Sequence, residues 1–224
     1  MSEPMSPSVG LGVIHLFCKV SASFDAEAVV GAVKNAENSG VTVIGVAVLG
    51  HKADLAIMGV AADLRELKGL QTGLQHAGLE VVDSYVSLTE VSEYAKGMPQ
   101  EMLDARLYPQ LPPPGKNAWC FYPMSKRRNV DQNWFTLSFE QRAELMAGHG
   151  KSGRTFAGRV IQLVTGSTGI DDFEWGVTLF AVNPDDLKEV VYTMRFDEGS
   201  ALYAEFGAFY VGMVTPIEEL VQQV

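Results

Sequence analysis

"VTVIGVAVLG" (residues 41–50) and "DLAIMGVAA" (residues 54–62) decide the fold class, because two β-rich apolar runs follow each other directly. The turn His51-Lys52-Ala53 separates them, and such a short connection is typical of a β-hairpin. The hairpin predicts two neighbouring strands in the middle of a module whose remaining elements lie on either side of it.

The sequence predicts one helix and one strand on each side of the hairpin. Before it, the apolar run 9–20 reads as a strand, and a helix is expected between a cap at Asp25 and a stop at Gly40. After it, regularly spaced leucines predict a helix over 62–77, and the run 78–88 reads as a further strand. The order β-α-β-β-α-β is that of a ferredoxin-like module.

The second half of the chain repeats this order after a Pro-rich stretch, "LYPQLPPPGK". We therefore expect a first module over residues 1–106, a linker over 107–116 and a second module over 117–224. One face of each sheet is covered by helices, and the other faces are expected to pack on each other as a dimeric α+β barrel, so the fold class is α+β. The second module is expected to have strands at 117–124, 159–167, 174–182 and 208–214, with helices at 138–150 and 184–196.

The charge of the chain is acidic overall but unevenly distributed. The 224 residues carry a formal net charge of -10, with a pI near 4.8. This argues against nucleic acid and anionic membranes as partners, since both require a broad cationic surface. The segment from Lys116 to Arg159 is nevertheless rich in basic residues, which indicates either a solvated cationic face or a site for a compact polyanion.

Several features indicate a cytoplasmic protein. Cys18 and Cys120 lie far apart within apolar strands and read as buried free thiols of a reducing compartment. The N-terminus has no Lys or Arg before Lys19, unlike a secretory signal. No apolar run reaches the ~18 residues of a membrane span.

"CFYPMSKRR" (120–128) contains the first candidate site. Alternation along a strand places Tyr122, Met124 and Lys126 on one face, if the strand extends that far. Pro123 lies in the opposite phase and predicts an edge strand or a bulge. The alternative is an amphipathic edge strand whose basic tip meets solvent.

His149 is the candidate metal ligand. The simple interpretation is a histidine favoured at a helix C-terminus by the macrodipole. The functional one is an iron ligand, because one imidazole is enough when a porphyrin supplies the other four nitrogens. A zinc site made of protein ligands alone is not expected, and the glycine motifs that bind phosphate are absent. The remaining histidines are expected to be structural or on the surface: His15, His51 and His76.

Longer motifs resemble a known family. "RLYPQL", "CFYPMSKRR", "NWFTLSFEQRAELMAGHG", "GRTFAGRVIQLVTGS", "DDFEWGVTLFA" and "VVYTMRFDEGSALYAEFGAFYVG" closely resemble the coproheme decarboxylase branch of the chlorite dismutase-like family. The strong likeness covers about residues 105–212. It implies two ferredoxin-like modules, a homopentamer, and the use of hydrogen peroxide to convert iron coproporphyrin III (coproheme) to haem b.

The resemblance also assigns roles to residues. It implies that Tyr122 is the catalytic radical and that His149 binds the iron of coproheme or haem b. Gln162 takes the distal position, where chlorite-degrading relatives have an arginine, so we expect no efficient chlorite degradation. The family's remaining porphyrin contacts fall on Arg106, Met124, Lys126 and Ser200.

The implied chemistry explains why an acidic protein would carry a cationic segment. Coproheme has four propionates, and a cation such as Lys126 can hold the reacting carboxylate while the Tyr122 radical removes a hydrogen atom from the propionate. Two rounds leave two vinyl groups. The rival functions are a haem-binding or haem-delivering protein without catalysis and a chlorite-degrading haem oxidoreductase.

Overall fold

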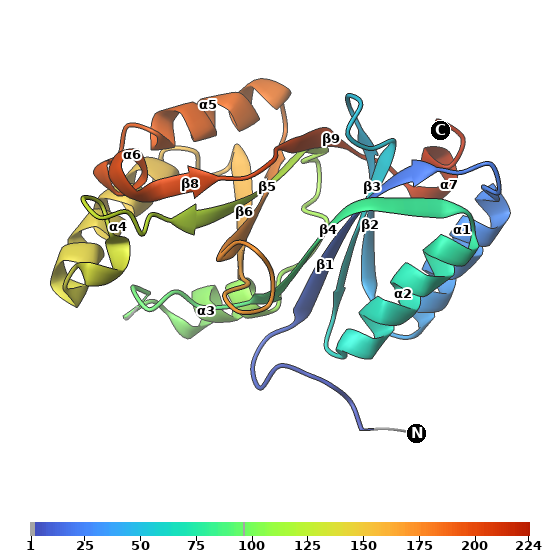
Figure 1. The fold of residues 1–224 in the computed structure, drawn as a ribbon, viewed down its shortest axis with the longest axis horizontal. Coiled ribbons are helices and arrows are strands. Elements are labelled where there is room, and N and C mark those ends of the chain that lie inside the picture. The colour runs from blue at the N-terminus through green and yellow to red at the C-terminus, as the bar shows by residue number, and fades with distance from the viewer. Residues whose placement is uncertain (1–2, 96) are drawn as a thin grey trace.

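The computed structural model describes residues 3–95 and 97–224 and shows a mixed α+β fold with an antiparallel sheet (Figure 1). The hairpin and its flanking elements form as expected. The elements of the first half are β1 (Gly12–Val20), α1 (Ala26–Asn38), β2 (Thr42–Val48), β3 (Leu55–Ala61), α2 (Leu64–His76), β4 (Leu79–Thr89) and α3 (Gln100–Leu107).

The second half contains the expected strands and helices, together with shorter elements that were not expected. Its elements are β5 (Ala118–Lys126), the 3-10 helix η1 (Trp134–Thr136), α4 (Phe139–Arg154), β6 (Val160–Gly166), β7 (Trp175–Ala181), α5 (Pro184–Met194), α6 (Glu198–Tyr203), β8 (Ala204–Phe206), β9 (Tyr210–Val214) and α7 (Ile217–Leu220).

Local capping explains where the longer helices begin. The Asp25 carboxylate accepts a hydrogen bond from the backbone N–H of Ala28 at 3.0 Å. Ser138 and Gln141 form a reciprocal capping box at the start of α4. These interactions satisfy backbone N–H groups that have no partner within the helix, so the helix starts are set by the local sequence.

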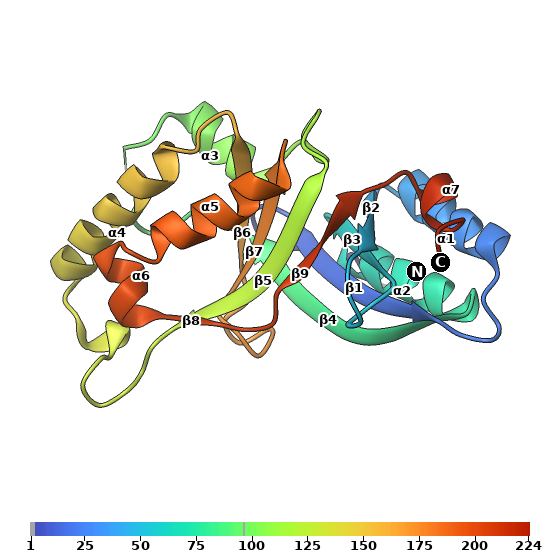
Figure 2. The same ribbon diagram turned by 90° about the horizontal axis from the view of Figure 1, so that it is seen from above.

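The strands of the two halves join in one sheet. Its order is β7-β6-β4-β1-β3-β2-β9-β5-β8, and β5 also pairs with β7, so the strands from β7 to β5 form a closed ring. The halves meet where β4 pairs with β6 and where β2 pairs with β9, which no sequence pattern predicted. Figures 1 and 2 show α1 and α2 on one side of the molecule and α4, α5 and α6 on the other.

Three apolar clusters occupy the spaces between these layers. One lies under α1 and α2, and another, around Trp119, Phe121 and Phe180, fills the inside of the ring. The third lies between α5 and the β5–β7 strands and contains Tyr122. The inside of the ring is therefore filled with side chains, which leaves the helix-covered face of the second half as the place for a site.

The cysteines and the histidines outside the candidate site lie where the sequence indicated. Cys18 and Cys120 are buried free thiols. His51 and His76 are exposed, in a turn and at the end of α2, respectively. His15 is buried inside the ring, where its Nε2 lies 3.0 Å from the Thr178 hydroxyl and burial lowers its pKa to about 3.

Candidate active site

Strand β5 carries the candidate residues on one face. It extends to Lys126, as the functional interpretation requires, so Tyr122, Met124 and Lys126 alternate onto the same side. Pro123 does not mark an edge, because β5 is paired on both sides. It lies where the partner strand changes: β9 pairs up to Phe121, and β8 pairs from Met124 onward.

Tyr122 lies in an aromatic enclosure. Its ring stacks on Phe209 with the centroids 4.5 Å apart, and Phe206 meets it edge-on at 5.7 Å. The side chain is 6% exposed, and burial raises its pKa well above the ordinary value of a phenol. Tyr122 therefore stays a neutral phenol, and oxidation to a neutral radical must remove a proton as well as an electron.

Lys126 is a buried cation with an aromatic neighbour. Its Nζ donates to the Gly199 carbonyl at 3.0 Å and lies 4.3 Å from the centre of the Trp134 ring. Burial lowers the pKa of Lys126 to about 8, and the nearby carboxylates of Asp197 and Glu174 oppose that shift. Because an ammonium group has three donors, it can hold a further carboxylate beside the Gly199 carbonyl.

The His149 imidazole is oriented by a carboxylate. Its Nδ1 lies 3.0 Å from Asp197 Oδ2 and 3.3 Å from the Ser200 hydroxyl. Since an ionised carboxylate only accepts, Nδ1 carries the proton and donates it to Asp197. No hydrogen bond joins Nε2 to any residue that the structure describes, so this nitrogen is available for a metal. A histidine whose other nitrogen donates to a carboxylate is a common form of metal ligand, so the surroundings of His149 suit an iron ligand.

The expectation that His149 closes its helix is wrong. Helix α4 continues to Arg154 and includes Gly150, which was taken as its stop. Gly150 can remain helical at a cost of about 1 kcal/mol, and the basic residues Lys151 and Arg154 favour the extended end. The macrodipole interpretation of His149 therefore loses its basis, which leaves the contact with Asp197 as the reason for its orientation.

Short helix α6 connects Lys126 with His149. Gly199 accepts from Lys126, while its neighbours Asp197 and Ser200 contact His149. The structure thus brings Lys126, His149 and Ser200 together around one segment. The sequence analysis missed Asp197. Its contact with His149 joins residues 48 positions apart, and no local pattern indicates such a contact.

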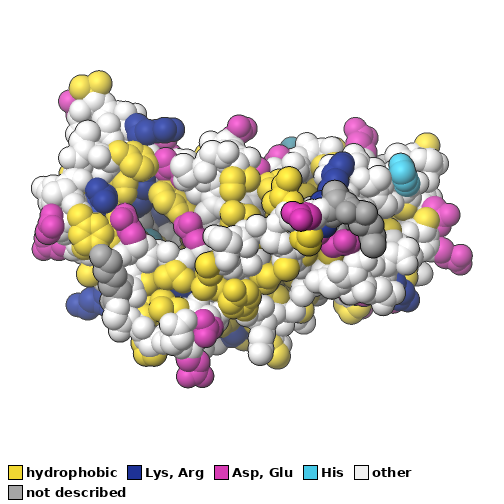
Figure 3. All heavy atoms as spheres, turned by 90° about the horizontal axis from the view of Figure 1, so that it is seen from below, with side chains coloured by type: hydrophobic (Ala, Val, Ile, Leu, Met, Phe, Trp, Pro, Cys, Tyr) yellow, Lys and Arg dark blue, Asp and Glu magenta, His cyan; other side chains and the backbone are white. Residues whose placement is uncertain are grey.

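Gln162 lies on the Tyr122 side of the sheet. In the register of β6, β7 and β5, Gln162 pairs with Leu179, which pairs with Cys120. Gln162 is exposed, and Val164, two residues along, is 39% exposed. This part of the sheet is therefore open, and Figure 3 shows a hollow in the same half of the molecule with hydrophobic and basic side chains at its rim.

Arg106 is not brought to the other candidates. It lies in the last turn of α3, and its Nη1 is 2.7 Å from the sulfur of Met98. Within residues 3–95 and 97–224, no hydrogen bond or ion pair connects it with β5, α4 or α6. The structure gives no contact that supports a role for Arg106 in this arrangement.

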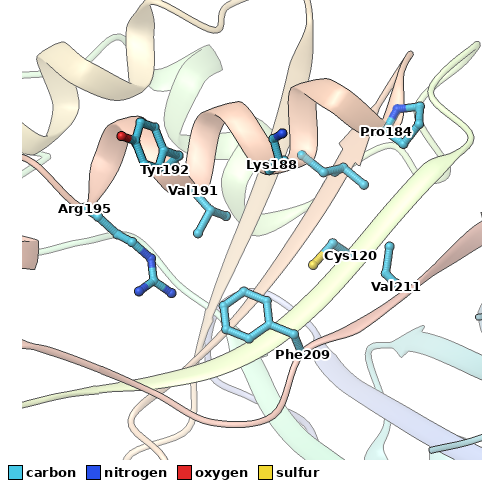
Figure 4. A pocket seen from close by; sticks show the side chains of 9 residues that line it. Cys120, Pro184, Lys188, Val191, Tyr192, Arg195, Phe209 and Val211 are labelled. Carbon is cyan, nitrogen blue, oxygen red and sulfur yellow. The ribbon is translucent and has the colours of Figure 1, made fainter. Parts of the chain in front are cut away.

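A cavity of about 400 Å³ lies beside the candidate site, under α5 (Figure 4). Phe209, which stacks on Tyr122, forms part of its wall, and Cys120 lies opposite α5. Arg195 points toward this space, and its guanidinium lies 5.0 Å from the Phe206 ring. The cavity is mainly apolar, with cationic groups at the α5 side.

The cationic segment is only partly available for an anionic ligand. Arg142 lies 3.5 Å from Glu93, and Arg159 lies 2.9 Å from both Asp186 and Glu189. These ion pairs neutralise some of the positive charge that the sequence suggested for a ligand. The buried Lys126 amine therefore contributes more to the candidate site than the summed charge of the segment.

Comparisons with known proteins identify the family. The chlorite dismutase family matches residues 22–215. The chain belongs to the chlorite dismutase family. It is 45% identical over 185 residues to coproheme decarboxylase from Staphylococcus carnosus, which covers 77% of this chain and 73% of that protein. The resemblance seen in the sequence motifs is confirmed.

Solved structures agree with this assignment. A haem-binding protein from Thermus thermophilus superposes with a TM-score of 0.85 at 35% identity, covering 99% of this chain and 98% of that one. A mutant chlorite dismutase from Candidatus Nitrospira defluvii has a TM-score of 0.77 at 18% identity, over 97% and 96% of the two chains, and shows the shared fold.

Two further observations concern the described part of the chain. None of its helices has the length and apolar character needed to cross a membrane. It also contains no group of three or more His, Cys, Asp or Glu side chains suited to a metal ion.

Proposed function

We propose that this enzyme is a coproheme decarboxylase, which uses hydrogen peroxide to convert two propionates of iron coproporphyrin III into vinyl groups and so forms haem b. The observation that carries the proposal is the 45% identity to the Staphylococcus carnosus enzyme of that name. The buried tyrosine and lysine on one face of β5 support it, because the reaction needs an oxidisable group next to a held carboxylate.

In this proposal, each candidate side chain has one task. His149 binds the iron through Nε2, with Asp197 fixing the proton on Nδ1. Lys126 holds the carboxylate of the reacting propionate. Ser200 contributes a further polar contact, and Gln162 lies on the distal side. Met124 packs against the porphyrin, and Arg106 contacts another propionate only if α3 lies closer to the ligand in the complex.

The redox balance of the reaction is simple. Peroxide takes up two electrons and two protons to become two waters, and one oxidising equivalent resides on Tyr122 as a phenoxyl radical. The radical removes a hydrogen atom from the β-carbon of the propionate. Loss of a second electron and of carbon dioxide then leaves a vinyl group. The raised pKa of Tyr122 keeps its proton in place until this oxidation.

The proposal also includes an assembly and a location. We propose that the two halves are ferredoxin-like modules packed as a dimeric α+β barrel, that the protein is a cytoplasmic homopentamer, and that it binds neither nucleic acid nor membranes. The ring of paired strands and the acidic net charge of -10 are consistent with this description.

One experiment tests the function directly. Purified protein is loaded with ferric coproheme, titrated with hydrogen peroxide, and its porphyrin is analysed by mass spectrometry. We expect two successive losses of carbon dioxide plus two hydrogens, ending at haem b. Tyr122→Phe should still bind coproheme but lose decarboxylation. Near wild-type turnover in that variant would refute the role of Tyr122.

A second function is favoured by the likeness to the Thermus thermophilus haem-binding protein. A protein that only binds or delivers haem would return coproheme with all propionates intact after peroxide addition. A chlorite-degrading oxidoreductase would release oxygen from chlorite, and Gln162 lacks the positive charge expected for that reaction. The same loaded protein therefore separates all three functions.

A further inference from the structure

Trp175 and Glu90 form a hydrogen-bonded pair on the same sheet face as Tyr122. The indole Nε1 of Trp175 donates to Glu90 Oε1 at 3.0 Å. Trp175 is the register partner of Met124, whereas Tyr122 pairs with Val177 on the same strand. Trp175 is thus a diagonal neighbour of Tyr122, and such neighbours lie within reach of aromatic side chains.

Gly166 makes room for this pair. It is the register partner of Trp175 on β6, so a Cβ at this position would point to the same face. That Cβ would fall 2.5 Å from Glu90 Cδ and would overlap the carboxylate oxygens. The Glu90 carboxylate therefore occupies the place of a missing side chain, beside the indole. Glu90 is exposed overall, but partial desolvation of its carboxylate raises its pKa, which makes it a better proton acceptor.

Within residues 3–95 and 97–224, no hydrogen bond joins the indole nitrogen of Trp119 or Trp134 to a carboxylate. Trp119 lies inside the strand ring, and its Nε1 has no hydrogen-bond partner in the described part of the chain. Trp134 faces the Lys126 ammonium at 4.3 Å, and a nearby positive charge opposes removal of an electron. An indole radical cation is strongly acidic at nitrogen, so a bonded carboxylate stabilises the oxidised form. These contacts favour Trp175 over the other two tryptophans as a site of oxidation.

We propose that Trp175 and Glu90 form a redox pair that takes the oxidising equivalent from Tyr122 when no propionate is in place to discharge it. One electron passes from the indole to the Tyr122 phenoxyl radical, which also takes up a proton from solvent and becomes a phenol again. The indole N–H proton moves to Glu90 Oε1, which leaves a neutral indolyl radical and a neutral carboxyl group. The oxidant is the peroxide of the proposed function, on which this inference rests.

The chain provides a clean chemical readout for the test. Cleavage after Arg159 and Lys188 gives the peptide 160–188, which contains Trp175 and no Met, Cys or Tyr. The peptide 129–142 contains Trp134 and likewise no Met, Cys or Tyr, so it serves as an internal control. Addition of oxygen to either peptide can therefore be followed by mass spectrometry, independently of porphyrin turnover.

The experiment uses protein loaded with haem b, which no longer carries the two propionates that Tyr122 would oxidise, and compares wild type with Glu90→Gln, Glu80→Gln and Tyr122→Phe proteins, each treated with hydrogen peroxide. Glu80 is an exposed residue near the start of β4, the strand that ends just before Glu90, and gives a matched control. In wild type we expect oxidation of peptide 160–188 to exceed that of peptide 129–142 several-fold, and Tyr122→Phe should lose this excess. Glu90→Gln should lower this oxidation several-fold, and Glu80→Gln should leave it unchanged.

Equal oxidation of the two peptides, or oxidation of Trp175 that is insensitive to Glu90→Gln, would overturn the redox pair. Wild-type protein loaded with coproheme is treated in parallel, and its porphyrin is analysed by mass spectrometry. Intact propionates there would refute the proposed decarboxylation, whereas vinyl products together with an unoxidised Trp175 would refute only the redox pair.

Discussion

Lys126→Met should reveal how much the buried ammonium group destabilises the folded protein. Lys126 is 7% exposed, and burial lowers its pKa from the ordinary 10.5 to about 8. At about 1.4 kcal/mol for each tenfold change in proton affinity, this corresponds to a ceiling of about 3 kcal/mol. The contacts of Nζ with the Gly199 carbonyl and the Trp134 ring are already part of the folded state.

The sign of the pH dependence follows from proton binding. Between about pH 8 and pH 10.5 the unfolded chain keeps the Lys126 proton while the folded protein has released it. The unfolded state then binds more protons, so the stability of wild type rises with pH relative to Lys126→Met. Below pH 8 both states are protonated, and the difference between the two proteins should be constant.

Urea unfolding from pH 7 to pH 10 measures this difference directly. The free energy of unfolding of wild type should gain up to about 3 kcal/mol on that of Lys126→Met over the range. Lys188→Met, at an exposed position on α5, serves as a control and should show no such trend. If the difference in the free energy of unfolding between wild type and Lys126→Met does not change across pH 8, Lys126 is not a buried ammonium group with a lowered pKa.

Coproheme binding should show the opposite trend. A carboxylate held by Lys126 favours the charged amine and raises its pKa in the complex. Coproheme binding above pH 8 then takes up a proton. The affinity of wild type for coproheme should therefore fall by up to about tenfold for each pH unit above pH 8. Lys126→Met should bind more weakly at pH 7 but lose this dependence, as followed by absorbance titration. A pH-independent wild-type affinity would contradict contact between Lys126 and a propionate.

Three further substitutions test other parts of the structure. Asp197→Asn keeps the cap of α6 but removes the carboxylate partner of His149, the proposed iron ligand, so coproheme affinity should fall about 10–100-fold; unchanged binding in an absorbance titration would contradict that role. Gly166→Ala should displace the flexible Glu90 carboxylate, with a loss of about 1 kcal/mol in urea unfolding and reduced peroxide oxidation of Trp175; an unaltered oxidation level would count against the close approach. Phe17→Ala should destabilise the protein by about 3–5 kcal/mol, because Phe17 is fully buried inside the strand ring, and a smaller loss would indicate that the ring can collapse around the gap.

The sequence predicted the order of the main elements because their signals are local. Apolar runs, caps and turns identify each strand and helix within a few residues of its observed bounds. Helices α3, α6 and α7 were missed, since α3 has almost no apolar face and α6 and α7 are very short. The joining of β4 with β6 and of β2 with β9 depends on the packing of the two halves, so no local pattern predicts it.

The site, like the fold, was predicted only where its signals are local. Alternation along β5 placed Tyr122 and Lys126 on one face, and the structure shows this arrangement. The partner of His149 is 48 residues away and the partner of Trp175 is 85 residues away, so both pairs arise only from the fold. Side chains that tune a functional group were therefore the ones that sequence reasoning missed.

Local placement of charge is more informative here than its sum. The basic segment suggested a cationic rim, yet Arg142 and Arg159 are already paired with carboxylates, which neutralise part of that charge. Lys126 is buried, has a lowered pKa, and uses one carbonyl and one aromatic ring as partners. In a poorly solvated position an arriving carboxylate interacts strongly with it and relieves the cost of burying the charge. Under the proposed function, one buried ammonium group placed four residues from Tyr122 would hold a propionate of the porphyrin although the protein carries a net charge of -10.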